Sequence, residues 1–425
     1  LTNFTGLLVI IAGCHFIKVR VAQYMAAFLI IQGMIVGVFC AMDAILFYVF
    51  WEGMLIPMYL SIGMWGSANR SYASIKFFLF TFFGSILMLV ALLYLYNKTG
   101  SFMIQNFYGL SLDLTTQKWL FAAFLFAFAV KVPMWPVHTW LPDAHTEAPA
   151  GGSVVLAALM LKLGIYGFFR FSMPITPLAC EKMAWVMIVL SLIAIVYIGL
   201  IAIVQTDMKK LIAYSSIAHM GFATLGCFMV YNIAVDSHSL ETAYMSLEGA
   251  VIQMVAHAFG SGAMFLGVGM LADRSLTHSR QIRDYGGVAN SMPIFAAFFM
   301  LFAMSNVGLP GTAGFVGEFM IIMSAVQSHF MVAVFASLTL ILSACYTLWM
   351  YKRVFFGVVA NDQVASFKDV SRLELFNYIL LAAGVFYIGL YPEPLINILR
   401  PTIGHLLLQS LSPDLALSVT DKLYL

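Results

Sequence analysis

The sequence contains few charged residues. Lysine, arginine, aspartate and glutamate together make up 9% of its 425 residues, whereas soluble domains carry roughly 25%. Apolar residues make up 62%, and the mean hydropathy is +0.95. So few charges cannot cover a water-facing surface of this length, which excludes a soluble protein and indicates a polytopic membrane protein. The sequence also lacks a basic cluster dense enough to bind nucleic acid.

Motifs for disulfides, metals and cofactors are also missing. The five cysteines are scattered without CxxC or comparable spacing: Cys14, Cys40, Cys180, Cys227 and Cys345. This pattern argues against disulfides, iron–sulfur clusters and structural zinc, and we expect no metal and no cofactor in this chain. A signal peptide is not indicated either, because Leu1 begins within an apolar run that lacks a basic start and a cleavage site. We interpret residues 1–22 as a remnant of N-terminal helices.

Long apolar runs are abundant. A helical span needs about 20 apolar residues at 1.5 Å each, and this measure gives twelve segments. They lack the polar–apolar alternation of membrane β-strands, so we predict an all-α membrane bundle without a separate soluble domain. The segments are 3–17, 23–40, 42–64, 75–96, 118–140, 150–172, 183–204, 210–231, 249–271, 291–328, 331–351 and 375–398.

Two of these segments contain helix-breaking residues. Segment 118–140 includes KVPMWP, and segment 291–328 includes GLPG. Each is the fourth helix of a group of five, within residues 23–172 and 183–351. Five is an odd number, so the second group would enter the membrane inverted, which is typical of inverted-repeat transporters. Residues 352–425 are predicted to form a last transmembrane helix and a polar surface tail.

Lysine and arginine are distributed unequally between the two sides of the predicted bundle. Most of them lie in the connections that follow odd-numbered segments, among them Arg20, Arg70 and Arg280. The positive-inside rule makes this side cytoplasmic, or the matrix side in a mitochondrion.

Six ionisable residues remain inside the apolar segments: Glu52, Lys131, Lys162, His219, His257 and Glu318. They come from six segments and lie at similar predicted depth. Such residues are costly in a bilayer and normally face the bundle interior or water. Unwound backbone is tolerated where it lines a wet cavity, so the proline break would create a hydrated gap beside Lys131.

We predict that these groups relay protons. A nearby carboxylate raises the proton affinity of a buried lysine, so Glu52 would tune Lys131. Lys162 would exchange protons with His257 and, through water, with Glu318. Histidine suits a relay because it titrates near neutral pH. The secondary relay candidates are His138 and His219.

Several candidates also have a purely structural interpretation. Lys162 could extend its side chain to the membrane interface, although it lies far from both ends of its segment. Glu52 and Lys131 could form a static salt bridge that holds two helices together. His219 and His257 could be hydrogen-bonded core histidines, and His138 could cap a helix end or be solvated.

Charged residues near the segment ends are interpreted as solvent-facing residues or as anchors at the membrane edge. The first group is Asp143, His145 and Glu147, and the second is Asp207, Lys209 and Lys210. Gly164 and Gly167 are expected to permit close helix approach.

Four motifs resemble the antiporter-like membrane subunits of respiratory complex I. They are FWEGMLIPMY, KVPMWPVHTWLPDAHTEAP, DMKKLIAYSSIAHMGF and GLPGTAGFVGEF, and the similarity covers roughly residues 20–400. The resemblance implies fourteen transmembrane helices with two inverted five-helix repeats, of which the first two helices would be absent here.

The resemblance also implies roles for individual residues. Glu52 and Lys131 match the family's glutamate–lysine pair. Lys162 matches its central lysine, and Glu318 matches the terminal residue near the outlet. The histidines that match the family's hydrophilic axis are His138, His219 and His257.

The resemblance further implies a proton-translocating membrane-arm subunit of NADH:quinone oxidoreductase, with a bacterial inner membrane favoured over a mitochondrial one. Its partners would be other membrane subunits of that complex, especially two antiporter-like paralogues, and membrane lipid. FMN, iron–sulfur clusters and quinone would belong to those other subunits. The alternatives are a subunit of a multisubunit Na⁺/H⁺ antiporter or membrane-bound hydrogenase, a haem-binding electron carrier using His219 and His257, and a structural scaffold.

Overall fold

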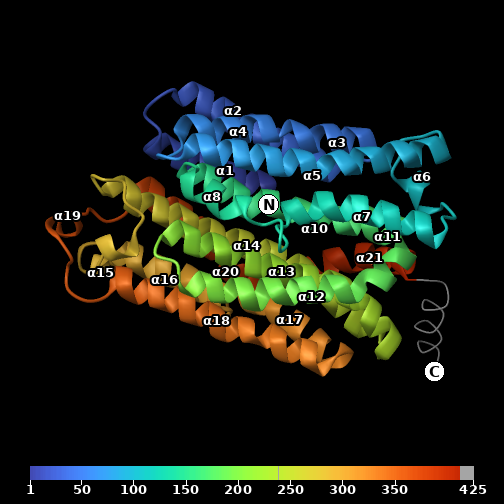
Figure 1. Ribbon diagram of the computed structural model, residues 1–425. Helices are drawn as coiled ribbons and strands as arrows, with labels where there is room; N and C mark the ends of the chain where they lie inside the picture. The colour runs from blue at the N-terminus through green and yellow to red at the C-terminus, as the bar shows by residue number, and fades with distance from the viewer. Residues whose placement is uncertain (238, 412–425) are drawn as a thin grey trace.

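The computed structural model describes residues 1–237 and 239–411, which contain helices and no strand. The helices run side by side along one axis (Figure 1). In chain order they are α1 Thr2–Phe16, α2 Val21–Cys40, α3 Ala44–Gly53, α4 Leu55–Trp65, α5 Arg70–Thr99, α6 Gln105–Tyr108, α7 Leu114–Lys131, α8 Trp140–Glu147, α9 Ala150–Val155, η1 Leu156–Met160, α10 Leu161–Gly167, η2 Phe168–Ser172, α11 Met173–Ile175, α12 Pro177–Ile203, α13 Met208–Asp236, α14 Leu240–Arg274, η3 Ile282–Asp284, α15 Val288–Ser291, α16 Pro293–Val307, α17 Ala313–Ser328, α18 Phe330–Phe355, α19 Asp362–Ala365, α20 Arg372–Leu390 and α21 Glu393–Ser410.

The predicted all-α membrane architecture is confirmed. Within the described residues, nine helical stretches are long and apolar enough to cross a membrane, and α16, α17 and the start of α1 are shorter apolar helices. Each of the twelve predicted segments corresponds to one or more helices. The inverted relation between the two five-helix groups stays a prediction.

Side-chain caps define where several helices begin. Asp43 precedes α3 and accepts hydrogen bonds from the amides of Ile45 and Leu46, each at 3.0 Å. Ser371 precedes α20 and forms a reciprocal capping box with Glu374. These contacts satisfy amides that the first turn of a helix leaves without a partner.

The predicted break in segment 118–140 is present. Helix α7 ends at Lys131, and the next helix, α8, begins at Trp140. The indole of Trp140 donates a hydrogen bond of 2.9 Å to the carbonyl of Val130. Because proline has no amide hydrogen and its ring crowds the preceding turn, Pro133 and Pro136 explain why the helix does not continue.

The predicted break in segment 291–328 is also present. Helix α16 ends at Val307, and Gly308 follows with φ of 83°, a conformation that glycine adopts without steric cost. Helix α17 begins at Ala313. A Cβ atom on Gly314 would lie 2.0 Å from the carbonyl oxygen of Ser305, so only glycine allows the two half-helices to pack this closely.

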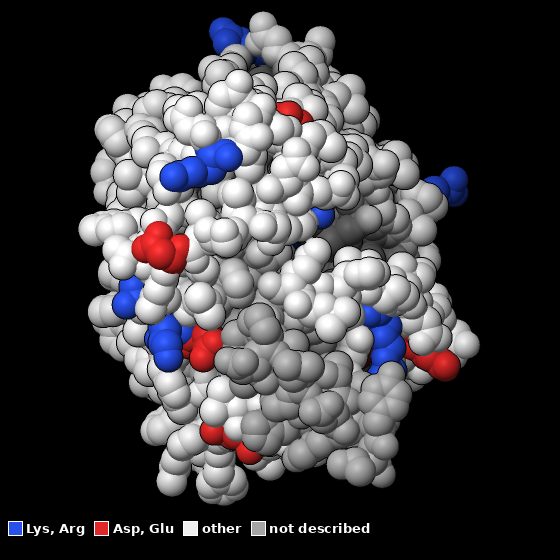
Figure 2. All heavy atoms as spheres, turned by 90° about the vertical axis from the view of Figure 1, so that its right-hand side faces the viewer, with Lys and Arg blue, Asp and Glu red and all other residues white. Residues whose placement is uncertain are grey.

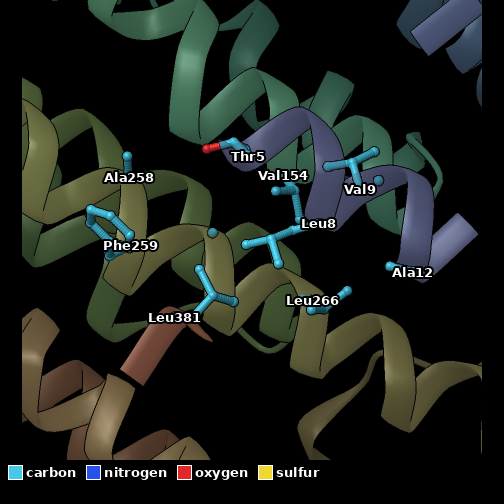
Figure 3. A pocket seen from close by; sticks show the side chains of 11 residues that line it. Thr5, Leu8, Val9, Ala12, Val154, Ala258, Phe259, Leu266 and Leu381 are labelled. Carbon is cyan, nitrogen blue, oxygen red and sulfur yellow. The ribbon is translucent and has the colours of Figure 1, made fainter. Parts of the chain in front are cut away.

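Helix α1 covers the middle of the bundle. Its side chain Leu8 faces α14 and α20 across a small apolar cavity of about 10 Å³, which Leu266 and Leu381 also line (Figure 3). These contacts join the N-terminal helix to the second half of the chain.

The region predicted as a polar surface tail begins as a helix. Residues 393–410 form helix α21, which packs against α14 and α11. Arg400 lies 2.6 Å from a carboxylate oxygen of Glu241 and 5.3 Å from the ring centre of Tyr244. Ile403 and Leu407 are buried because they share one face of an amphipathic helix, a pattern that low average hydropathy conceals. Residues 412–425 of the predicted tail lie outside the described residues.

The two ends of the bundle differ in character. Helices α15 and α19 lie at one end, with the connections that carry most lysines and arginines (Figure 1). Figure 2 shows the opposite end, where charged side chains are few and scattered. The positive-inside rule places the α15 end in the cytoplasm or matrix.

Candidate functional site

Lys162 lies in helix α10, between two π-helical turns. Its side chain is 4% exposed. The Nζ atom donates a hydrogen bond to the carbonyl of Ala157 in η1 and lies 2.6 Å from Nδ1 of His257 in α14. A π-turn shifts the backbone hydrogen-bond register. Here the carbonyl oxygen of Ala157 accepts its side-chain hydrogen bond from Nζ of Lys162.

Helix α10 can approach α7 closely because of two glycines. A Cβ atom on Gly164 would lie 2.8 Å from the carbonyl oxygen of Phe128, and one on Gly167 would lie 2.4 Å from the ring of Phe128. The expected close helix approach at these two positions is confirmed. It brings the helix that carries Lys162 against the helix that ends at Lys131.

A second cluster continues from His257. The imidazole rings of His257 and His219 lie 5.7 Å apart between their centres, and Nδ1 of His219 lies 3.0 Å from a carboxylate oxygen of Glu318. All three side chains are buried. Four residues on α10, α14, α13 and α17 therefore form one group, which begins at Lys162 and ends at Glu318.

Gln253 also belongs to this group, although it was not among the residues predicted from the sequence. Its Nε2 atom lies 3.3 Å from Nδ1 of His219 and 3.2 Å from Oε1 of Glu318. Gln253 precedes His257 by four residues on α14, so the two side chains share one helix face. A polar residue one turn before a predicted relay histidine was the available signal.

A small polar cavity lies within the same group. It has a volume of about 10 Å³, and its lining includes His219, Gln253, His257, Asn306 and Glu318. Five atoms of the lining residues have no hydrogen-bond partner among the described residues: Nε2 of His219, Nε2 of His257, Oε1 of Gln253, Oγ of Ser305 and Oε2 of Glu318. About this much space is needed to hold one water, and the lining supplies polar partners for it.

Glu52 and Lys131 are not in direct contact. Lys131 is 1% exposed, and its Nζ atom lies 5.1 Å from the ring centre of Trp51 without a hydrogen-bond partner among the described residues. Glu52 instead accepts a hydrogen bond from the hydroxyl of Ser85 on α5. No ion pair within 4.0 Å joins the two side chains in the described part of the chain, so the static salt bridge considered above is not formed here.

The prediction that Asp143, His145 and Glu147 are solvated was wrong for two of the three. The segment forms helix α8 inside the bundle, where His145 and Glu147 are buried and only Asp143 is partly exposed. His145 stacks on Phe265 with 4.5 Å between ring centres, and neither ring nitrogen has a hydrogen-bond partner among described residues. The polar composition suggested a loop, but the half-helix after the proline break packs against α5 and α13.

The structure also buries His138, which lies in the break between α7 and α8. Its Nδ1 atom has no hydrogen-bond partner in the described residues. It is therefore not a solvated residue at a helix end, and its predicted secondary role stays a prediction.

The interpretation of Lys209 as a membrane-edge anchor was wrong. Lys209 is buried, and its Nζ atom donates to the carbonyl of Ala148 at 2.7 Å and to the hydroxyl of Ser153 at 3.2 Å. The hydroxyl of Ser153 in turn donates to the carbonyl of His145 at 2.9 Å. Lys209 therefore ties the start of α13 to the connection between α8 and α9.

Arg280 joins four connections at the same end of the bundle. It lies 3.3 Å from Asp207 and 3.5 Å from Glu147, and it donates to the hydroxyl of Ser67 and the carbonyl of Thr146, each at 2.6 Å. Asp207 also caps α13. This network could not be predicted from sequence patterns, because its members are far apart along the chain.

The site offers groups that exchange protons, and it gives no support to a haem. The described residues contain no group of three or more His, Cys, Asp or Glu side chains that could hold a metal ion. The cavity that both His219 and His257 line has a volume of about 10 Å³, whereas ligand pockets typically have roughly 300–1,000 Å³. A porphyrin does not fit between these histidines.

Comparisons with known proteins place this geometry in context. Residues 41–343 match the family described as NADH:quinone oxidoreductase/Mrp antiporter, transmembrane. The chain is 46% identical over 419 residues to NADH-quinone oxidoreductase subunit M of Rhodobacter capsulatus, covering 96% of this chain and 79% of that protein. It is 43% identical over 408 residues to NADH-ubiquinone oxidoreductase chain 4 of Prototheca wickerhamii, covering 96% of this chain and 75% of that protein.

Solved structures show the same architecture. A chain in the structure of respiratory complex I from Thermus thermophilus with bound NADH aligns with a TM-score of 0.86 and 29% identity, covering 96% of this chain and 84% of that one. A chain of the Mrp complex from a Dietzia species aligns with a TM-score of 0.81 and 20% identity, covering 95% and 82%. The latter likeness extends to the fold alone.

Proposed function

This chain belongs to the NADH:quinone oxidoreductase/Mrp antiporter transmembrane family, and we propose that it is a proton-translocating membrane subunit of an NADH:quinone oxidoreductase. Within that complex it corresponds best to subunit M. The resemblance implies that paralogous subunits usually carry lysine where this chain has Glu318, and the relatives named subunit M are 41–46% identical to it. The redox chemistry that drives transport would take place in other subunits.

The observation that carries the proposal is the contact sequence Lys162–His257–His219–Glu318. Lys162 and His257 share a contact of 2.6 Å, a distance at which a proton can pass along a hydrogen bond. Protonated Lys162 would give a proton to Nδ1 of His257, and the resulting imidazolium would release the proton on Nε2. Lys162 then becomes neutral, which lowers the cost of its burial.

The next transfer would cross the small polar cavity. Nε2 of His257 and Nε2 of His219 both lack a protein partner among described residues, and both residues line the cavity. One water there would accept the proton from His257 and pass a proton to His219. His219 would then release the proton on Nδ1 to the carboxylate of Glu318, 3.0 Å away.

Glu52 and Lys131 would form a separate step of the proton path, in which the Glu52 carboxylate takes two positions. In the arrangement described here, Ser85 donates to Glu52, and the Nζ atom of Lys131 lies 5.1 Å from the ring centre of Trp51, a contact that an ammonium group can make with an indole ring. Movement of Glu52 toward Lys131 would strengthen the lysine's hold on its proton, and movement away would weaken it. Ser85 would therefore compete with Lys131 for Glu52.

The proposed setting is a bacterial cytoplasmic membrane, where neighbouring membrane subunits of the same complex would continue the path. A Na⁺/H⁺ antiporter subunit is less well supported, because the relatives named NADH-quinone oxidoreductase reach 46% identity and the Mrp chain reaches 20%. The two can be separated by asking whether NADH drives proton movement in sodium-free medium.

The experiment uses the assembled complex in inverted membrane vesicles. NADH-driven acidification is followed with a pH-sensitive dye, and NADH oxidation by an artificial electron acceptor reports on assembly. Lys162→Ala should abolish or strongly reduce acidification while acceptor-linked oxidation persists. Normal acidification in Lys162→Ala would overturn the relay, and loss of both activities would require the milder Lys162→Gln variant to decide.

A further inference from the structure

A polar cleft of about 420 Å³ opens at the Lys- and Arg-rich end of the bundle. It lies between the connection from α1 to α2, the end of α4 and the start of α5. The residues that line it are Val19, Arg20, Gly63, Met64, Trp65 and Arg70. None of them belongs to the proposed relay.

Two arginines face this cleft without an acidic partner. The guanidinium of Arg20 makes no hydrogen bond or ion pair with the described residues, and that of Arg70 donates only to the carbonyl of Gly66, at 3.3 Å. Most of their donor groups therefore remain free. The two guanidinium groups carry like charges and repel each other across the cleft. An anion bound between them would be attracted to both.

The wall between the two arginines is held in place. The indole of Trp65 donates a hydrogen bond of 3.0 Å to the carbonyl of Val19, which fixes the α1–α2 connection against the end of α4. Arg20 adopts φ of 54°, a left-handed conformation that is uncommon for residues other than glycine, asparagine and aspartate. The backbone thus holds an arginine at this rim in a conformation that glycine would adopt more easily.

The surroundings indicate a ligand that is both anionic and apolar. The cleft lies on the side where the positive-inside rule places the cytoplasm, and cytoplasmic leaflets carry acidic lipids that attract basic residues. Val21 directly follows Arg20, and Tyr72 lies two residues after Arg70; their side chains are 39% and 60% exposed. A guanidinium can bind a phosphate through two parallel hydrogen bonds, and the neighbouring apolar side chains can contact acyl chains.

We propose that this cleft binds the phosphodiester group of an acidic membrane phospholipid, with Arg20 and Arg70 on either side of the phosphate. The site is separate from proton transfer, so its occupancy can be tested even if the relay is wrong. Free phosphate offers the same anionic oxygens but no acyl chains, and the two sources can be told apart by competition.

The test measures the binding of spin-labelled phosphatidylglycerol to the assembled complex in phosphatidylcholine nanodiscs. Arg20→Gln and Arg70→Gln should each lower the affinity of one tightly bound phosphatidylglycerol by about fivefold. This is the effect expected for one basic residue near the membrane surface. Arg283→Gln is the matched control because it removes an exposed charge from the same end, where its side chain is 87% exposed, and it should leave binding unchanged. Inorganic phosphate should not displace the lipid.

Arg20→Gly separates loss of the guanidinium from damage to the fold. Glycine adopts the left-handed conformation without cost, so assembly should be retained while lipid binding falls as in Arg20→Gln. Unchanged lipid binding in Arg20→Gln and Arg70→Gln, or an equal loss in Arg283→Gln, would overturn the proposal. Displacement by inorganic phosphate would overturn its lipid part. The unaltered complex could bind no lipid while the Arg20 and Arg70 variants fail to assemble. That result would show that the cleft contacts another protein instead of a lipid.

Discussion

The Nζ atom of Lys162 lies 2.6 Å from Nδ1 of His257, and the two residues are 95 positions apart in the sequence. The buried side chain of Lys162 therefore contacts a titratable partner and does not extend to solvent. At this distance one of the two groups must be neutral, because two cations without water between them would repel strongly. The contact thus ties the protonation of Lys162 to that of His257, which is the property a relay requires.

Replacement of His257 tests this coupling. His257→Leu removes the acceptor for the Lys162 proton, and we expect NADH-driven acidification to fall on the order of 100-fold, the typical contribution of a positioned acid–base group. Assembly should persist, because leucine is compatible with the apolar faces of α14. The measurement is dye quenching in inverted vesicles, with acceptor-linked NADH oxidation as the assembly control. His278→Leu, which changes an exposed histidine, should have no effect, and normal acidification in His257→Leu would contradict the relay.

Gln253 gives a second and more specific test. Its Nε2 atom lies within 3.3 Å of both His219 and Glu318, so Gln253→Leu removes an amide group that contacts both side chains. We expect turnover to fall by roughly tenfold, in line with a lost hydrogen bond to a charged group of about 1.5 kcal/mol. Gln253→Glu should impair turnover as well, because a second carboxylate beside Glu318 favours a protonated glutamate. Unchanged rates in both variants would remove Gln253 from the site.

Hydropathy was enough to predict the long apolar helices, because a bilayer requires each span to satisfy its own backbone hydrogen bonds. The breaks after Lys131 and Val307 were also predictable from proline and glycine. Helix α21 was not, because its buried residues Ile403 and Leu407 are diluted by polar neighbours. Average hydropathy hides an amphipathic helix that lies against the bundle.

The candidate site was predictable residue by residue but not in its contacts. Lys162, His257 and Glu318 stood out as ionisable groups in apolar segments, and the structure brings them together with His219. The expected contact between Glu52 and Lys131 is absent from the described residues, because Ser85 holds the carboxylate. Such a competing hydrogen bond depends on the packing of α3 against α5, which the sequence pattern does not encode.

Arg280 should contribute to stability through its contacts with distant connections. It bonds Ser67, Thr146 and Asp207, and its removal would leave Asp207 and Glu147 buried without their cation. We expect Arg280→Ala to lower the free energy of unfolding by on the order of 2–3 kcal/mol. The measurement is the dissociation temperature of the purified complex. Arg283→Ala is the control, because its exposed side chain lies 3.7 Å from exposed Asp284, and equal effects of the two changes would contradict the assignment.

Ser85 should set the balance between the two arrangements of Glu52. Ser85→Ala removes the hydroxyl that donates to Glu52, so the carboxylate becomes free to move toward Lys131. We expect slower turnover, because a persistent Glu52–Lys131 ion pair would hold the lysine's proton. Ser85→Thr keeps the hydroxyl and should be close to the unaltered protein. If Ser85→Ala and the unaltered protein transport protons equally fast, Ser85 has no part in the switch.

Gly308 places backbone directly against Glu318. A Cβ atom on Gly308 would lie 2.7 Å from Oε2 of Glu318, and the residue has φ of +83°. Gly308→Ala therefore has two effects: a backbone cost of roughly 1–2 kcal/mol for a left-handed residue, and a steric push on the carboxylate. Gly357→Ala reproduces only the first, because Gly357 has φ of +91° with nothing within 4 Å of its Cβ position. Both variants should lose similar thermal stability, and only Gly308→Ala should also lose NADH-driven acidification at temperatures where the complex remains assembled. Equal acidification in the two variants would show that the position of Glu318 does not limit proton transfer.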